Sequence, residues 1–139
     1  MTEWTTRELV ENGYEIENGK ITDVDLSMED HGVITLTLSV EGYGCGFVYG
    51  GYALGHGYLG ADHFDSNSHA LVYIMKIMDT VGVERFNELK GKYIRFATNG
   101  WGSNVSIIGN VISDKWFDAK SFFEEIDLKG ENRNDRKNY

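Results

Sequence analysis

Two stretches of the chain hold residue types that could do chemistry, and the first is rich in histidine. It places three histidines and two aspartates within 14 residues: His56, Asp62, His63, Asp65 and His69. Imidazole and carboxylate groups together can bind a transition metal. The spacing contains no HExxH, no cysteine pair and no calcium-loop ligand order. A polar loop with a helix-capping aspartate explains the same residues, so we predict no metal site.

Nucleophilic catalysis finds little support in the sequence. Cys45 lies between two glycines and has no basic neighbour in sequence that would favour its thiolate. No serine lies in a GxSxG turn. The 22 acidic residues always offer carboxylate pairs, so pairing alone is uninformative. We therefore predict a protein with no catalytic residues and no cofactor. A hydrolase that uses the histidine-rich loop is the enzymatic alternative.

The second stretch surrounds the last expected hairpin and combines a cation, amides and an aromatic face: Arg95, Asn99, Trp101 and Asn104. Adenine recognition needs a flat stacking partner and amide-like hydrogen bonds, while phosphates need arginine or backbone N–H groups. Gly100 and Gly102 would let backbone N–H groups approach a phosphate. The alternative is an ordinary hairpin in which Trp101 packs on the sheet and Arg95 forms a surface ion pair.

A third stretch, from Gly42 to Gly60, is rich in glycine and aromatic residues. It overlaps the start of the histidine-rich region and lies before the last hairpin. It holds eight of the 17 glycines, and glycine lets another backbone or a ligand come close. Its aromatic rings offer flat faces and directed hydroxyls, and we predict that Tyr52 among them binds a ligand. No phosphate-loop fingerprint is present. The stretch is typical either of a twisted strand pair with bulges or of a ligand-binding wall.

Composition narrows the classes of partner. The formal net charge of −9 opposes binding of bulk nucleic acid, which needs a basic surface. A small nucleotide stays possible, because a pocket needs only a few well-placed donors. An acidic surface could also imitate nucleic acid toward a basic partner. The apolar runs are too short for a bilayer, no leader is evident and Cys45 is the single cysteine, so we expect a cytoplasmic protein.

Local patterns predict the elements that must position these residues. We expect a short helix over 1–12 with a capping box at Thr5 and Glu8, and a hairpin turn at Asn18–Gly19. Strands should follow over 20–26, 33–40 and 47–49, with a turn at 29–32 between the first and the second. The glycine-rich strand should pair back on 33–40.

The second half of the chain should hold the main helix, over 68–81. It should bury Ala70, Leu71, Ile74, Ile77, Met78 and Val81, begin at a serine or Asn67 cap and end at Gly82. A short helix over 83–89 and strands over 92–96 and 105–112 should follow. Asp118 should cap a last helical turn through Phe122 and Phe123.

These elements predict an α+β fold: an antiparallel sheet of about five or six strands with one main helix packed on it and short accessory helices. We expect an accessory N-terminal segment over 1–13, with Leu9 and Val10 as its core contacts. A single domain should span 14–128, and a polar, mobile tail 129–139.

Three runs also carry a resemblance to a known family: IENGKITDVDLSMEDHGVITLTLSVEGYGCGFVYGGYALG, VGVERFNELKGKYIRF and IIGNVISDKWFDAKSFFEE. Together they resemble the phage Thoeris anti-defence family of signal sponges, over about 14–125. The resemblance implies that the protein sequesters a cyclic ADP-ribose isomer made by bacterial TIR immune proteins without cleaving it. By residue type, the matching ligand residues are Arg95, Phe96, Asn99, Trp101 and Asn104.

The same resemblance implies a homo-oligomer built from dimers, with the nucleotide near a subunit interface. Some relatives in that family also bind cyclic oligonucleotides at a separate site. The acidic balance supports a different class of function, an inhibitor that covers the nucleic-acid-binding surface of a basic host defence protein such as a CRISPR effector. Both hypotheses place the protein in phage–host conflict, and they differ in whether the partner is a small molecule or a protein.

Overall fold

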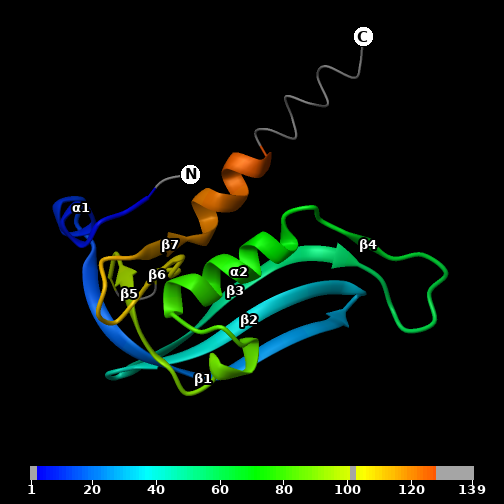
Figure 1. Ribbon diagram of the computed structural model, residues 1–139, viewed down its shortest axis with the longest axis horizontal. Helices are drawn as coiled ribbons and strands as arrows, with labels where there is room; N and C mark the ends of the chain where they lie inside the picture. The colour runs from blue at the N-terminus through cyan, green and yellow to red at the C-terminus, as the bar shows by residue number, and fades with distance from the viewer. Residues whose placement is uncertain (1–2, 101–102, 128–139) are drawn as a thin grey trace, which may run out of the picture.

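A computed structural model describes residues 3–100 and 103–127 (Figure 1). The elements are α1 (Thr6–Glu11), β1 (Glu15–Asp30), β2 (Val33–Gly42), β3 (Cys45–His56), β4 (Asp65–Ser66), α2 (Ala70–Val81), the 3-10 helix η1 (Phe86–Glu88), β5 (Tyr93–Thr98), β6 (Ile107–Gly109), β7 (Trp116–Asp118) and a helix over 119–127. The predicted tail over 129–139 lies outside the described residues.

The strands form one antiparallel sheet in the order β4-β3-β2-β1-β5-β6-β7. The predicted α+β class with one main helix is confirmed, with seven strands instead of five or six. In the part of the chain that the structure describes, no helix is long and apolar enough to cross a membrane.

The hairpin turn predicted at Asn18–Gly19 is wrong, because β1 runs straight through both residues. Gly19 pairs with Gly42 of β2 on one side and with Ile94 of β5 on the other. A Cβ at Gly19 would lie 2.7 Å from a methyl carbon of Val40, so glycine serves close packing here and not a turn. The β1–β2 turn is His31–Gly32, with φ of 55° and 78°, inside the predicted 29–32 segment.

Strand β3 lies wholly within the glycine-rich stretch and pairs back on β2, as predicted. The pairing register shifts twice between Ile34 and Thr37, so this strand pair carries the expected bulge. Opposite the shift, Gly50 and Gly51 have left-handed φ values of 101° and 87°. A side chain at Gly50 would also collide with the Leu36 carbonyl oxygen, which leaves glycine as the residue that fits.

Helix α2 packs across the sheet (Figure 1) and buries Tyr73, Ile77 and Val81 in the main core. It ends at Gly82 in the left-handed conformation, as predicted. Two details of the prediction are wrong. Leu71, expected in the core, is 72% exposed, and Tyr73 takes the buried place. The N-cap is His69, without a side-chain cap bond, because the Asn67 amide donates to the Ala53 carbonyl oxygen instead.

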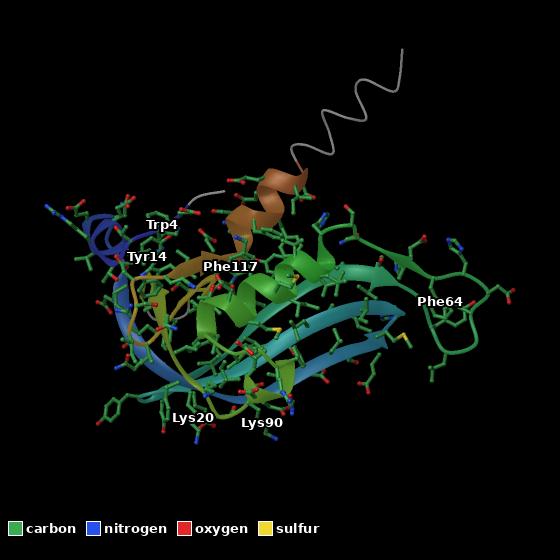
Figure 2. The ribbon with its side chains drawn as sticks, in the orientation of Figure 1. Trp4, Tyr14, Lys20, Phe64, Lys90 and Phe117 are labelled. Atoms are coloured by element: carbon green, nitrogen blue, oxygen red, sulfur yellow. The ribbon has the colours of Figure 1, made fainter. Side chains whose placement is uncertain are left out.

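A second, smaller core lies where α1 covers β5 and β6. Leu9 is fully buried there beside Ala97 and Trp116, whereas Val10, predicted as a core contact, is 58% exposed. Figure 2 shows Trp4 near Tyr14 at this end of the molecule, with ring centroids 5.8 Å apart. The capping box is confirmed in part, because the Glu8 backbone N–H donates to the Thr5 hydroxyl at 3.1 Å.

The predicted helix start at Asp118 is confirmed as well. Its carboxylate accepts a hydrogen bond from the Ser121 backbone N–H at 3.2 Å, and the helix runs over 119–127, beyond the single turn that was expected. Phe122 and Phe123 from this helix are buried in the main core beside Tyr73.

The sheet curls strongly about its long axis. Phe47 of β3 and Phe96 of β5 are separated by β2 and β1 in the strand order, yet their ring centroids lie 4.7 Å apart. Gly19 and Gly42 leave room for the Phe96 ring on the intervening strands, and the sheet itself is twisted and bent (Figure 1). The curl brings the free edge of β3 toward the segment that follows β5.

Candidate functional site

The free edge of β3 borders a large pocket. Strand β4 pairs with β3 at Gly55 and His56 only, so among the described residues the rest of this edge has no strand partner. A pocket of about 700 Å³ lies against it. Residues 47–52 and 103–107 line the pocket consecutively on its two sides. Side chains alternate between the faces of a strand, so consecutive lining means that backbone edges form the walls. We call this pocket the seam.

Polar side chains complete the seam. Tyr52 comes from β3, Asn99 and Asn104 from the connection between β5 and β6, and Lys120 from the helix over 119–127. Among the described residues, neither asparagine side chain has a hydrogen-bond partner. Lys120 has one weak partner, Glu124, at 4.0 Å on the surface. The seam therefore offers free amide groups, a phenol and an ammonium group in a volume typical of small-molecule sites.

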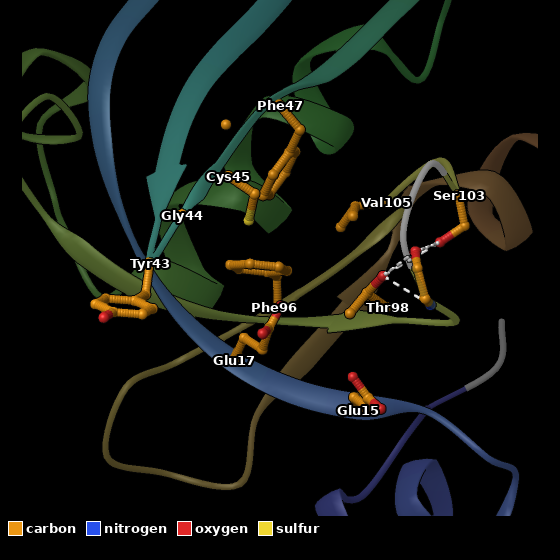
Figure 3. A pocket seen from close by; sticks show the side chains of 12 residues that line it. Glu15, Glu17, Tyr43, Gly44, Cys45, Phe47, Phe96, Thr98, Ser103 and Val105 are labelled. Atoms are coloured by element: carbon orange, nitrogen blue, oxygen red, sulfur yellow. Dashed lines mark hydrogen bonds between the residues drawn. The ribbon is translucent and has the colours of Figure 1, made fainter.

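A second pocket of about 330 Å³ opens beside the seam and shares Phe47, Ser103 and Val105 with it. We call it the mouth. Figure 3 shows Glu15 and Glu17 on β1 at one rim of the mouth and Ser103 and Val105 at another. The two glutamates are two residues apart and so share one face of the strand. Neither has a hydrogen-bond or ion-pair partner among the described residues.

The loop wall of the mouth is held by the Thr98 hydroxyl. The Gly100 N–H donates to this hydroxyl at 3.2 Å, and the hydroxyl lies 3.2 Å from the Ser103 hydroxyl. The Ser103 hydroxyl donates in turn to the Gly100 carbonyl oxygen at 2.7 Å. These bonds shape the connection after β5, while Phe47 and Phe96 form the apolar walls.

The structure separates the predicted ligand residues. Tyr52, Asn99 and Asn104 line the seam, and Phe96 lines the mouth. Trp101 lies outside the described residues.

Arg95 lines neither pocket, because neighbours along β5 point to opposite faces. Its Nε donates to the Asn110 carbonyl oxygen at 2.7 Å, and its Nη2 to that of Ser113 at 2.9 Å. The guanidinium also lies 4.8 Å from the centre of the Trp116 ring. Arg95 thus holds the connection between β6 and β7, and its position gives it no access to a ligand in either pocket.

Sequence reasoning missed several residues that line the pockets, above all Lys120, Glu15 and Glu17. Each belongs to a segment whose local pattern indicates only an ordinary helix or strand. No local pattern marks them, because they meet the seam and mouth only through the curl of the sheet and the direction of the last helix.

The histidine-rich segment holds no metal-binding geometry. His63 Nε2 lies 3.0 Å from an Asp65 carboxylate oxygen, and both side chains are exposed. His69 packs edge-on against Phe122 and Phe123. Within residues 3–100 and 103–127, no three His, Cys, Asp or Glu side chains are close enough to share an ion.

Three tyrosines, Tyr49, Tyr52 and Tyr73, lie at or next to the seam with their phenol groups wholly or partly buried. Burial raises the pKa of Tyr49 well above its usual range, and the neighbouring Tyr73 and Tyr52 phenols raise it further. Burial likewise raises the pKa of Tyr52, which lines the seam. The hydroxyl of Tyr73 has no hydrogen-bond partner among the described residues. The phenols therefore stay neutral at physiological pH and cannot serve as bases.

No family model, curated protein or solved structure matches the chain.

Proposed function

We propose that the protein is a non-catalytic binder that holds a nucleotide-sized ligand in the seam. Cyclic ADP-ribose isomers are the first ligands to test, because the resemblance implies them, and sequestration of such a signal would block TIR-based immunity. The seam itself supports the proposal: a large pocket with backbone walls, free amides, a phenol and a lysine ammonium group. Three residues expected to bind the ligand, Tyr52, Asn99 and Asn104, meet there.

The shape of the β3 edge favours a compact ligand over an added polypeptide strand. A strand template needs a regular, flat row of backbone groups. Here Gly50 and Gly51, with left-handed φ values, interrupt the row at a bulge. Bulges twist an edge away from further pairing. The same irregularity leaves backbone groups facing the seam, where a small polar ligand can use them.

The lining suits the parts of a cyclic dinucleotide-like molecule. Aromatic side chains such as Tyr14 and Tyr52 provide ring faces against which a ribose can pack. The amides of Asn99 and Asn104 can both donate and accept hydrogen bonds. Lys120 provides positive charge for a phosphate.

The same groups support binding without turnover. Amides and neutral phenols hold a ligand by hydrogen bonds and do not activate a nucleophile. Among the described lining residues of the seam there is no histidine, cysteine or carboxylate. The Ser106 hydroxyl donates to Asp118 at 3.3 Å, but that carboxylate is buried and does not line the seam. We expect a bound ligand to be released intact.

The test is recovery of the ligand. The protein is incubated with the nucleotide mixture made by a TIR enzyme, washed and heat-denatured, and the released molecules are identified by mass spectrometry. An intact cyclic ADP-ribose isomer supports the proposal, and Asn104→Ala should reduce its recovery while the exposed control Asn87→Ala should not. A cleaved product would make the protein an enzyme. A folded protein that retains no small molecule would overturn the proposal in favour of the acidic protein inhibitor.

A further inference from the structure

We infer that the ligand binds with a fixed polarity, its nucleoside part in the mouth and its phosphates in the seam. This inference rests on the proposed function. The observation behind it is a separation of charge between two adjoining pockets. Glu15 and Glu17 line the mouth, and no lysine or arginine does so among the described residues. Lys120 lines the seam, and no described carboxylate does so.

The mouth has the chemistry of a nucleoside site. Carboxylates are acceptors only, and they bind the vicinal hydroxyls of a ribose or the amino group of a base. Both glutamates lack a partner among the described residues, so their acceptor oxygens are available to such donors. The Phe47 and Phe96 rings form apolar walls beside them, against which a base can pack.

The same carboxylates exclude a phosphate from the mouth. Glu15 and Glu17 are exposed, and two unpaired negative charges on one strand face repel a third that comes close to them. A ligand with both a nucleoside and a phosphate part therefore lowers its free energy by directing the phosphate away from Glu15 and Glu17. The seam adjoins the mouth, because Phe47, Ser103 and Val105 line both pockets, and it is therefore the space that the phosphate can enter.

The seam supplies what a phosphate needs. Lys120 is its charged lining residue, and its weak partner Glu124 leaves the ammonium group available. At Gly51, a Cβ would meet no atom within 4 Å, so the backbone there is open to the pocket. The amide groups of Asn99 and Asn104 add neutral donors.

Fragments of a nucleotide test the polarity directly. The ¹⁵N-labelled protein is titrated with adenosine, with inorganic pyrophosphate and with cyclic ADP-ribose, and backbone amide shifts are followed by NMR. Adenosine should move the amide signals of Glu17, Phe96 and Thr98. Pyrophosphate should move those of Gly51 and Lys120, and cyclic ADP-ribose should move both sets.

Two charge-removing variants sharpen the assignment. Glu17→Gln should weaken adenosine binding about tenfold, because a hydrogen bond to a charged acceptor becomes a neutral one. It should not weaken pyrophosphate binding, because it removes a charge that repels phosphate. Lys120→Gln should do the reverse. Glu84→Gln and Lys92→Gln, on exposed residues that line neither pocket, serve as matched controls.

Failure of the inference differs from failure of the proposed function. If cyclic ADP-ribose binds but pyrophosphate moves the mouth amides, or one variant weakens both fragments equally, the polarity is wrong and the binding function stands. If cyclic ADP-ribose binds and neither fragment moves its expected set, the polarity is also wrong. If none of the three probes moves any amide signal, both the polarity and the proposed function are overturned.

Discussion

Two polar regions of the molecule differ in how their hydrogen bonds are used. The first, which we call the junction, lies where the N-terminal segment meets β7 and the last helix. There the Trp4 indole donates to Asp118 at 3.1 Å, and the Thr6 hydroxyl and backbone N–H donate to Asp114 at 2.6 and 2.7 Å. The Trp116 indole donates to Asp114 as well, at 2.9 Å. The second region is the seam with its mouth, whose asparagines and glutamates have no such partners among the described residues.

The difference separates structural polar groups from available ones. A buried polar group that finds its partner within the protein stabilises a defined packing, and its loss leaves the partner unsatisfied. A polar group beside an open pocket keeps its hydrogen-bonding capacity for water or a ligand. Arg95 on β5 belongs to the first group, because its guanidinium is hydrogen-bonded within the protein. Glu17, near it on β1, belongs to the second, because it lines the mouth without a described partner. Polar residue type alone does not distinguish them.

The largest expected effect concerns the junction. Trp116 is 8% exposed, lies beneath the Arg95 guanidinium and contacts the space that a side chain on Gly109 would occupy. Trp116→Ala should lower the free energy of unfolding by about 3–5 kcal/mol, through lost burial and a cavity. Urea unfolding measures this. Tyr43→Ala, at a fully exposed mouth residue, should change it by less than about 0.5 kcal/mol. Equal effects of the two variants would remove the distinction between the regions.

The next effect concerns the seam and should appear in binding but not in stability. Asn104 is exposed, lines the seam and has no partner among the described residues. Asn104→Ala should leave the free energy of unfolding within about 0.5 kcal/mol of wild type. Loss of its hydrogen bond to the ligand should weaken cyclic ADP-ribose binding about tenfold in titration calorimetry. A large loss of stability would show that Asn104 is structural after all.

A smaller effect should depend on acid pH. The hydrogen bonds from the Thr6 hydroxyl and backbone N–H hold the pKa of Asp114 below its usual value. A lowered folded-state pKa contributes stability above the unfolded value of about 4, which is lost as the pH falls through the folded-state pKa. Asp114→Asn should therefore be less stable than wild type at pH 7, and the gap should narrow at pH below about 4. The effect should be small, because the carboxylate is exposed. A gap that widens in acid would contradict it.

The smallest effect at neutral pH concerns Tyr73, whose buried hydroxyl has no described partner. Tyr73→Phe should be neutral or slightly stabilising, because no hydrogen bond is lost. Burial raises the pKa of Tyr73, so its contribution is complete below the unfolded value of about 10 and is lost as pH rises above it. The variant should lose less stability than wild type between pH 8 and 11, as measured by urea unfolding. A marked loss at pH 7 would reveal a bound partner for this hydroxyl.

Local sequence patterns predicted the elements whose causes are local. The Thr5 cap, the β2 strand, the Gly82 stop of α2 and the Asp118 cap each depend on residues within a few positions of one another. The failures have distant causes. Asn18–Gly19 resembles a hairpin turn, but Val40 and Phe96 pack so closely on Gly19 that the strand continues through it.

Tertiary packing likewise decided which face of each helix or strand is buried. The pattern of α2 indicated an amphipathic helix and yet placed Leu71 inside instead of Tyr73, because the aromatic rings from the last helix accept Tyr73. The alternation of β5 predicted a strand without showing that Arg95 would face Trp116 and Phe96 the mouth.

The sequence by itself determined a small, acidic α+β protein with its glycines placed for a bulged strand pair and its amides after β5. Only the tertiary structure decided which of these residues meet. The seam joins 47–52, 103–107 and Lys120, segments that share no local pattern. They come together because the sheet curls until Phe47 reaches Phe96 across two intervening strands. That curl results from packing between residues distant in sequence, so the short-range propensities of the strands do not predict it.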